Sequence, residues 1–85
     1  MSLTKDERYI IKLYEDALKD GNPLNLKDRY KIGEFFGLSD KVVKGMVKVL
    51  QQANFVKLVD EKGIHLTPHG VNLAKKLKDE LENSK

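Results

Sequence analysis

Eighty-five residues are enough for one small domain, and a chain of this length buries only about 60–65% of its unfolded surface. Apolar residues make up 40% and charged residues 34%, a balance typical of globular chains. The chain has no cysteine, which excludes disulfides and thiolate metal sites, and no apolar run approaches the ~18–20 residues of a membrane span. We therefore expect a cytoplasmic protein. Since little chain is left to wall a substrate cavity, we expect no enzyme, no catalytic residue and no cofactor.

The first helix is predicted over about residues 5–20. Thr4 and Glu7 have the spacing of a capping box, in which each side chain satisfies an amide at the helix start. Apolar residues then recur at helical spacing and form one stripe, made of Ile10, Leu13, Tyr14, Ala17 and Leu18. The segment 21–23, Gly-Asn-Pro, ends the helix, and we expect residues 24–26 to form a short strand.

Two further helices are predicted on either side of Gly37. The first runs over about residues 27–36, with Tyr30, Ile32, Phe35 and Phe36 at its apolar positions. Ser39 is well placed to cap the second, which we expect over residues 40–53. Their three-residue connection has the spacing of a helix-turn-helix.

After residue 54 the hydrophobic period changes from that of a helix to that of a strand. Residues 55–59 and 64–67 are rich in β-branched and apolar side chains, and a four-residue loop that ends in glycine separates them. This pattern predicts a hairpin. Thr67 and Pro68 then open a last helix, whose apolar residues are Val71, Ala74, Leu77 and Leu81. We expect residues 83–85 to be a disordered tail.

Three segments in this order resemble winged helix-turn-helix regulators. Residues 32–39, Ile-Gly-Glu-Phe-Phe-Gly-Leu-Ser, are similar to the turn of those proteins. Residues 50–56 are similar to the exit from their recognition helix, with Asn54 where they usually have glycine. Residues 66–70, Leu-Thr-Pro-His-Gly, resemble the step from wing to last helix in MarR-like (multiple-antibiotic-resistance-type) and related small bacterial and archaeal transcriptional regulators. The resemblance implies an α+β fold over residues 1–85: a winged helix-turn-helix domain with a three-helix core, a β-hairpin wing over 55–67 and a C-terminal helix.

The resemblance also implies a DNA-binding transcriptional regulator. In such proteins the helix over about 40–53 would lie in the major groove of double-stranded DNA, and the wing would lie on the flanking backbone. Residues 38–54 carry three lysines and one aspartate, a net charge of +2 in a chain whose net charge is +3. The DNA-binding residues expected by this mapping are Ser39, Lys41, Lys44, Gly45, Lys48, Lys57, Lys62 and His65.

Two features of the sequence predict weak binding by one monomer, mostly without sequence preference. Its two arginines, Arg8 and Arg29, lie outside both the recognition helix and the wing, and lysine lacks the two-pronged contact that arginine makes with guanine. Asp60 and Glu61 lie in the wing, where their charge would repel the DNA backbone.

This weakness leads us to expect a homodimer, with two recognition helices in successive major grooves. In related regulators the first and last helices commonly form the two-fold interface. The alternative is that the stripe on the last helix only closes the monomer core; Leu81, far along that helix, is the residue most expected to face another subunit, and Leu3 and Ile11 are further candidates. The interface residues predicted here are Tyr9, Val71, Ala74 and Leu81.

Other classes of function are weighed against this one. The alternative is a winged-helix module for protein–protein interaction in a larger complex, without direct DNA binding. His65 and His69 lie on a strand and at a helix start and would share no helix face, so we predict no metal site. There is no room for an effector domain, so any small-molecule effector would have to bind between helices or at the dimer interface.

Overall fold

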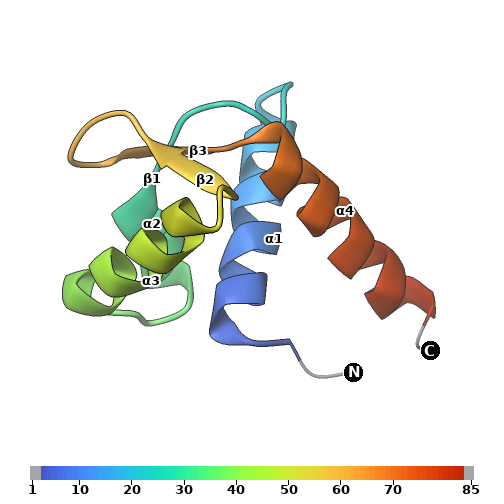
Figure 1. Ribbon diagram of the computed structural model, residues 1–85, viewed down its shortest axis with the longest axis horizontal. Coiled ribbons are helices and arrows are strands. Elements are labelled where there is room, and N and C mark those ends of the chain that lie inside the picture. The colour runs from blue at the N-terminus through green and yellow to red at the C-terminus, as the bar shows by residue number, and fades with distance from the viewer. Residues whose placement is uncertain (1–2, 84–85) are drawn as a thin grey trace.

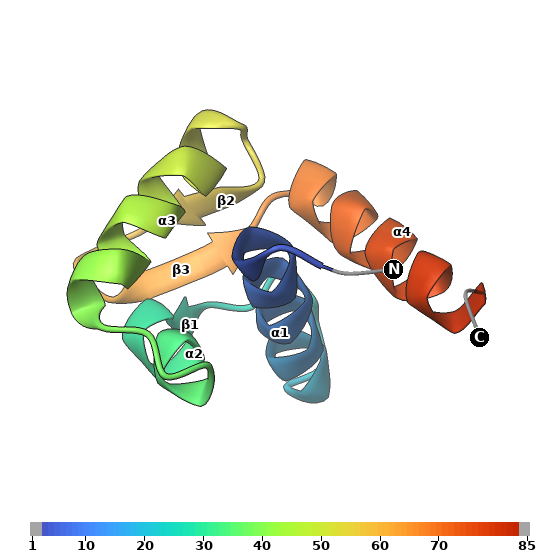
Figure 2. The same ribbon diagram turned by 90° about the horizontal axis from the view of Figure 1, so that it is seen from below.

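The computed structural model describes residues 3–83 of the chain. Helix α1 lies between α4 on one side and the remaining elements on the other (Figures 1 and 2). Within residues 3–83, no helix is both long enough and apolar enough to cross a membrane. In chain order the elements are α1 (Lys5–Lys19), β1 (Lys27–Asp28), α2 (Arg29–Phe35), α3 (Asp40–Gln52), β2 (Val56–Leu58), β3 (Gly63–Leu66) and α4 (Pro68–Asn83).

The predicted helix caps are confirmed. The Thr4 hydroxyl accepts a hydrogen bond from the Glu7 amide at 3.1 Å, and the Glu7 carboxylate accepts one from the Thr4 amide at 2.9 Å. The Ser39 hydroxyl accepts from the Val42 amide at 3.3 Å at the start of α3. After α3 the chain turns at Asn54, whose φ of 64° is the left-handed conformation that the sequence suggested for this position.

The sheet has three antiparallel strands in the order β1-β3-β2, so β3 lies in the middle. The predicted hairpin is confirmed, with Lys57 opposite His65. The predicted strand at residues 24–26 is wrong: the strand is Lys27–Asp28, which pairs with Ile64 and Gly63. The helix expected from residue 27 therefore begins at Arg29, because the Asp28 carboxylate caps its first amides.

The last helix is longer than predicted. Asn83, which we expected in a disordered tail, is the final residue of α4, and residues 84 and 85 of that tail lie outside the described part of the chain. Helix α4 begins as predicted, because the Thr67 hydroxyl accepts a hydrogen bond from the Gly70 amide at 3.0 Å. The same hydroxyl donates to the carbonyl of Asn54 at 2.6 Å, which joins the start of α4 to the end of α3.

One hydrophobic core joins all four helices to the sheet. Helix α1 contributes most of its predicted apolar stripe and packs along α4, but Leu18, the last residue of that stripe, is 44% exposed. Because α3 also turns one face into this core, its opposite face is left exposed. The buried residues of the core are Tyr9, Ile10, Leu13, Tyr14, Ile32, Val43, Met46, Val47, Leu50, Val56, Ile64, Leu66, Val71 and Ala74.

Candidate nucleic-acid interface

Helix α3 carries a basic face that points away from the core. Val43, Met46, Val47 and Leu50 are buried and fix the orientation of the helix. The basic face consists of residues that are all exposed, as the helical period predicts: Lys41, Lys44, Gly45 and Lys48. A Cβ atom at Gly45 would have no heavy atom within 4 Å, so nothing in the described chain shields the backbone there. Ser39 is exposed at the start of the helix, and its hydroxyl is engaged as the cap.

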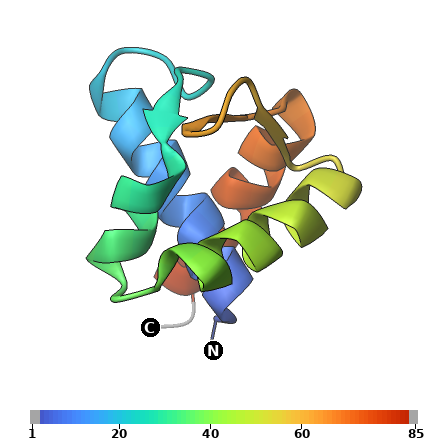
Figure 3. The same ribbon diagram turned by 90° about the vertical axis from the view of Figure 1, so that its left-hand side faces the viewer.

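The wing tip, residues 59–62, lies at the same end of the molecule as α3 (Figure 3). It is fixed to the start of α2 by Arg29, whose exposed fraction is only 6%. The Nε of Arg29 donates to the Glu61 carbonyl at 2.8 Å, and its amide donates to the Lys62 carbonyl at 2.9 Å. The wing is therefore held by a buried guanidinium that comes from a different part of the sequence.

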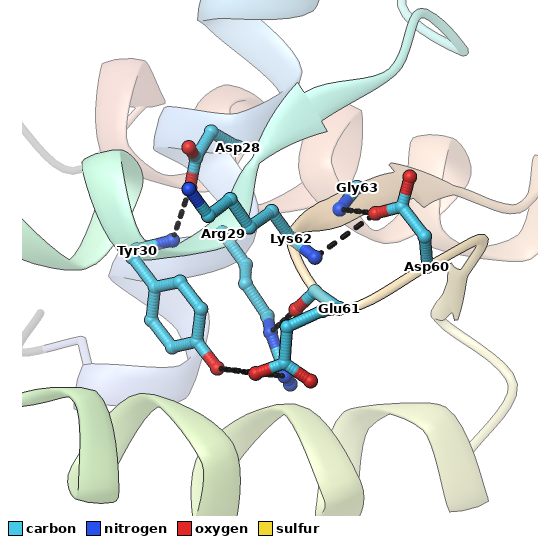
Figure 4. A network of polar contacts seen from close by, with 7 residues as sticks. All are labelled: Asp28, Arg29, Tyr30, Asp60, Glu61, Lys62 and Gly63. Atoms are coloured by element: carbon cyan, nitrogen blue, oxygen red, sulfur yellow. Dashed lines mark hydrogen bonds and ion pairs between the residues drawn. The ribbon is translucent and has the colours of Figure 1, made fainter.

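Three side chains of this network meet beside the wing tip. Nη2 of Arg29 lies 2.8 Å from the Tyr30 hydroxyl and 3.5 Å from Oε1 of Glu61. The Tyr30 hydroxyl donates to the same Glu61 oxygen at 2.9 Å. Figure 4 shows these three groups together on the side of the wing that faces α3.

Both wing carboxylates have partners within the protein. Hydrogen bonds from the amides of Gly63, at 2.5 Å, and Lys62, at 2.9 Å, lower the pKa of Asp60. The hydrogen bond from Tyr30 lowers the pKa of Glu61, and the charges of Arg29 and Lys44 lower it further. These carboxylates, which the sequence suggested only as sources of repulsion, thus shape the wing and tie it to α2.

The wing residues predicted to contact DNA lie in two separate places. Lys62, at the tip, lines an open hollow of about 560 Å³ together with Lys27 and Lys31. Lys57 and His65 face each other on β2 and β3 and line another hollow, of about 250 Å³, to which α3 contributes no residue. Lys57 and His65 thus line a hollow apart from that of Lys62, and their contact with DNA stays a prediction.

The two histidines make different contacts. Nδ1 of His65 lies 2.8 Å from the carbonyl oxygen of Leu66. The His69 ring is stacked on Phe55, with ring centroids 4.7 Å apart and an interplanar angle of 10°. His65 thus belongs to strand β3 of the wing, and His69 packs against Phe55, which directly precedes strand β2.

Three of the four predicted interface residues are buried within one chain and are not available on its surface. Tyr9 and Ala74 are fully buried and Val71 is 9% exposed, all within the core of one chain. Tyr9 also donates from its hydroxyl to the carbonyl of Arg29 at 2.7 Å, within the same core. The alternative interpretation of the stripe on α4, closure of the monomer core, holds for Val71 and Ala74. Leu81 is half-buried and remains a prediction.

Phe35 is the exposed aromatic side chain that the sequence pattern assigned to the apolar side of its helix. Its exposed fraction is 64%, and Nζ of Lys12 lies 4.0 Å from its ring centroid. The ring meets Phe36 edge-on at 5.0 Å. Both rings lie at a hollow of about 230 Å³ that is also lined by Leu3, Ile11 and Leu81. An apolar surface patch is therefore present where the ends of α2 and α4 approach α1.

Sequence reasoning missed Arg29 and Tyr30 as parts of the wing. Their partner Glu61 is more than thirty positions away, so no local spacing connects them. The one available signal was that arginine is rare in this chain.

The folded chain closely resembles solved structures. No protein-family model matches the chain, and no curated protein matches it. NadR in complex with 4-hydroxyphenylacetate is 18% identical, with a TM-score of 0.73 over 96% of this chain and 58% of NadR. AF1382 from Archaeoglobus fulgidus is 22% identical, with a TM-score of 0.73 over 98% of this chain and 92% of that one. MepR, a transcription regulator of the Staphylococcus aureus multidrug efflux pump MepA, is 19% identical, with a TM-score of 0.67 over 98% of this chain.

The chain has a winged-helix fold. The predicted resemblance to MarR-family regulators is thereby confirmed as a likeness of structure, and these identities show the fold alone. The chain spans 58% of NadR and 63% of MepR, so both are substantially longer. A mutant of MepR has been solved with a bound oligodeoxyribonucleotide, at a TM-score of 0.66 to this chain.

Proposed function

We propose that this protein is a DNA-binding transcriptional regulator, with α3 in the major groove and the β2–β3 wing on the flanking backbone. The basic face of α3 carries this proposal: Lys41, Lys44 and Lys48 are exposed along one side of a helix whose other side is buried. That arrangement fits the groove-reading helix of a winged-helix protein. The DNA-bound MepR mutant, which has the same fold, supports it.

The chemistry of this face favours phosphate contacts over base recognition. Lysine acts as a point charge, and each phosphate that it neutralises adds about 0.9 to the salt dependence of log K. Helix α3 contains no arginine that could make a two-pronged contact with guanine. We expect one protomer to bind DNA modestly and with little sequence preference.

A triple variant tests the proposal. Lys41→Ala, Lys44→Ala and Lys48→Ala together should weaken binding to a labelled duplex by about 100-fold at ~50 mM salt and reduce the salt slope by about 3. The matched control replaces Lys19, Lys75 and Lys76, which are exposed on α1 and α4, so that the same charge is removed elsewhere. Fluorescence anisotropy over a salt series gives both quantities. Equal losses in the two variants, or no binding by the wild type, would contradict the proposal.

A homodimer would supply the affinity that one protomer lacks. The apolar surface patch of Leu3, Ile11, Phe35, Phe36 and Leu81 is its proposed contact, because an exposed phenylalanine beside an apolar hollow gains most from burial against a second copy. Sedimentation equilibrium tests this proposal. We expect a dimer at tens of micromolar and a monomer after Phe35→Ser; a monomeric wild type at that concentration would contradict it.

The same patch favours a second candidate function, a protein–protein interaction module. Phe35 would then be the contact for a different protein, and α3 would not bind DNA. The lysine variants distinguish the two functions, because a module of this kind requires neither the three α3 lysines nor a salt-dependent affinity for a duplex.

A further inference from the structure

Positive and hydrogen-bonding groups converge on the Glu61 carboxylate at the wing tip. Nη2 of Arg29 is 3.5 Å from Oε1 of Glu61, and the Tyr30 hydroxyl donates to the same oxygen at 2.9 Å. The charge of Lys44, on the basic face of α3, also acts on this carboxylate. One anionic group is thus bound by two side chains of α2, and a lysine of α3 adds positive charge nearby.

The side chains of Arg29 and Glu61 differ greatly in how far they can move. The Arg29 side chain is only 7% exposed, and its Nε bond to the Glu61 carbonyl fixes the guanidinium in place. The Glu61 side chain is 71% exposed, so its carboxylate can turn into solvent without disturbing the core. The donors therefore form a rigid site whose present occupant is easily displaced.

The proposed docking brings a DNA strand to the same place. A helix in the major groove and a wing on the neighbouring backbone lie on either side of one sugar–phosphate strand. The Glu61 carboxylate lies on the side of the wing tip that faces α3, which is where that strand would pass (Figure 4). Carboxylate and phosphodiester oxygens accept hydrogen bonds from the same donors, and guanidinium suits both.

We propose that Arg29 and Tyr30 form a phosphodiester-binding subsite beside the basic face of α3, in which the Glu61 carboxylate stands in place of the phosphate in the free protein. This inference rests on the proposed function and deepens it. A DNA phosphate displaces the Glu61 side chain into solvent, while the backbone of Glu61 stays bound to Nε of Arg29 and keeps the wing in position. Glu61 is thus an internal competitor that lowers the affinity for DNA.

The test compares Glu61→Gln with Asp60→Asn. Both variants remove one negative charge from the wing tip. The Asp60 carboxylate accepts hydrogen bonds from the backbone amides of Lys62 and Gly63, and the side-chain oxygen of an asparagine can accept the same bonds. We expect Glu61→Gln to raise the affinity for a random-sequence duplex about 5–10-fold at ~50 mM salt, and Asp60→Asn to raise it less than about twofold. Equal gains in the two variants would overturn the subsite.

A second pair of variants tests the donors. Arg29→Lys keeps the charge but loses the forked hydrogen-bond donors of the guanidinium. We expect it to abolish most of the gain in DNA affinity when it is combined with Glu61→Gln. Since Arg29 is buried, circular dichroism must first show that this variant folds; if it does not, Tyr30→Phe in the Glu61→Gln background decides, with an expected loss of about threefold. If Glu61→Gln keeps its full gain in DNA affinity without the Tyr30 hydroxyl and the Arg29 guanidinium, the proposal is overturned.

The outcomes separate the two proposals. If the wild type binds DNA through its three α3 lysines while Glu61→Gln behaves like Asp60→Asn, the subsite alone is wrong. If neither the wild type nor Glu61→Gln binds a duplex at ~50 mM salt, the proposed function is wrong as well.

Discussion

Gly33 in α2 and Val43 in α3 approach so closely that a Cβ atom on residue 33 would lie 2.3 Å from Cγ2 of Val43. Val43 is fully buried, so it has little space into which it could move. This contact sets how the two helices of the helix-turn-helix cross. We predict that Gly33→Ala lowers the free energy of unfolding by about 1–3 kcal/mol, measured by urea denaturation. An unchanged midpoint would show that α2 shifts freely relative to α3.

Gly45 gives the opposite prediction on the exposed side of α3. A Cβ atom there would have no heavy atom within 4 Å, so Gly45→Ala should raise the free energy of unfolding by about 0.5–1 kcal/mol through helix propensity. If the backbone at Gly45 approaches DNA, the same variant should bind a duplex more weakly in the anisotropy assay although it is more stable. A DNA affinity equal to that of the wild type would remove Gly45 from the interface.

The Tyr9 hydroxyl satisfies the carbonyl of Arg29 from within the core. Tyr9→Phe leaves that buried carbonyl without this donor, and we expect it to cost about 1–2 kcal/mol of stability in thermal or urea unfolding. Tyr14→Phe is the control, because the contact of Lys78 with the Tyr14 ring survives the change. Equal effects of the two substitutions would contradict the importance of the buried hydrogen bond.

Asn54 occupies a left-handed conformation with φ of 64° at the exit of α3. Asn54→Ala should cost about 1 kcal/mol of stability, since alanine tolerates this region poorly, whereas Asn54→Gly should be close to neutral. Differential scanning calorimetry of the pair measures the difference. A glycine variant as unstable as the alanine variant would mean that the asparagine side chain itself is needed.

The acid sensitivity of the wing follows from its carboxylates. The pKa values of Asp60 and Glu61 are lowered in the folded chain, so both carboxylates stabilise it above their unfolded pKa values, near 4. That contribution is lost as the pH falls from about 5 through the folded-state pKa values. We expect the urea midpoint of Glu61→Gln to fall less steeply over this range than that of the wild type. Parallel curves would contradict a role for Glu61 in stability.

The local features of this fold could be predicted from sequence because they depend on residues a few positions apart. The Thr4–Glu7 capping box and the Ser39 cap were predicted in this way and are present. The left-handed Asn54, which the resemblance to winged-helix regulators implied, is present as well. The strand at residues 24–26 was wrong because pairing with β3, far along the chain, decides that β1 lies at Lys27–Asp28.

The same distinction applies to the candidate site. The helical period alone predicts that the three α3 lysines are exposed. It does not predict that Phe35 is exposed. Helix α2 has only seven residues, which is too few for the period to show which of its apolar side chains face the core. The role of Arg29 at the wing tip was missed because only the folded chain brings it to Glu61.

Strand β3 is paired along both of its edges, and Arg29 binds the loop that connects β2 to β3. The wing therefore acquires its shape when the chain folds. A ligand that binds the wing does not have to order a flexible hairpin, so little conformational entropy is lost on binding. The hairpin thus meets its ligand as a preorganised surface.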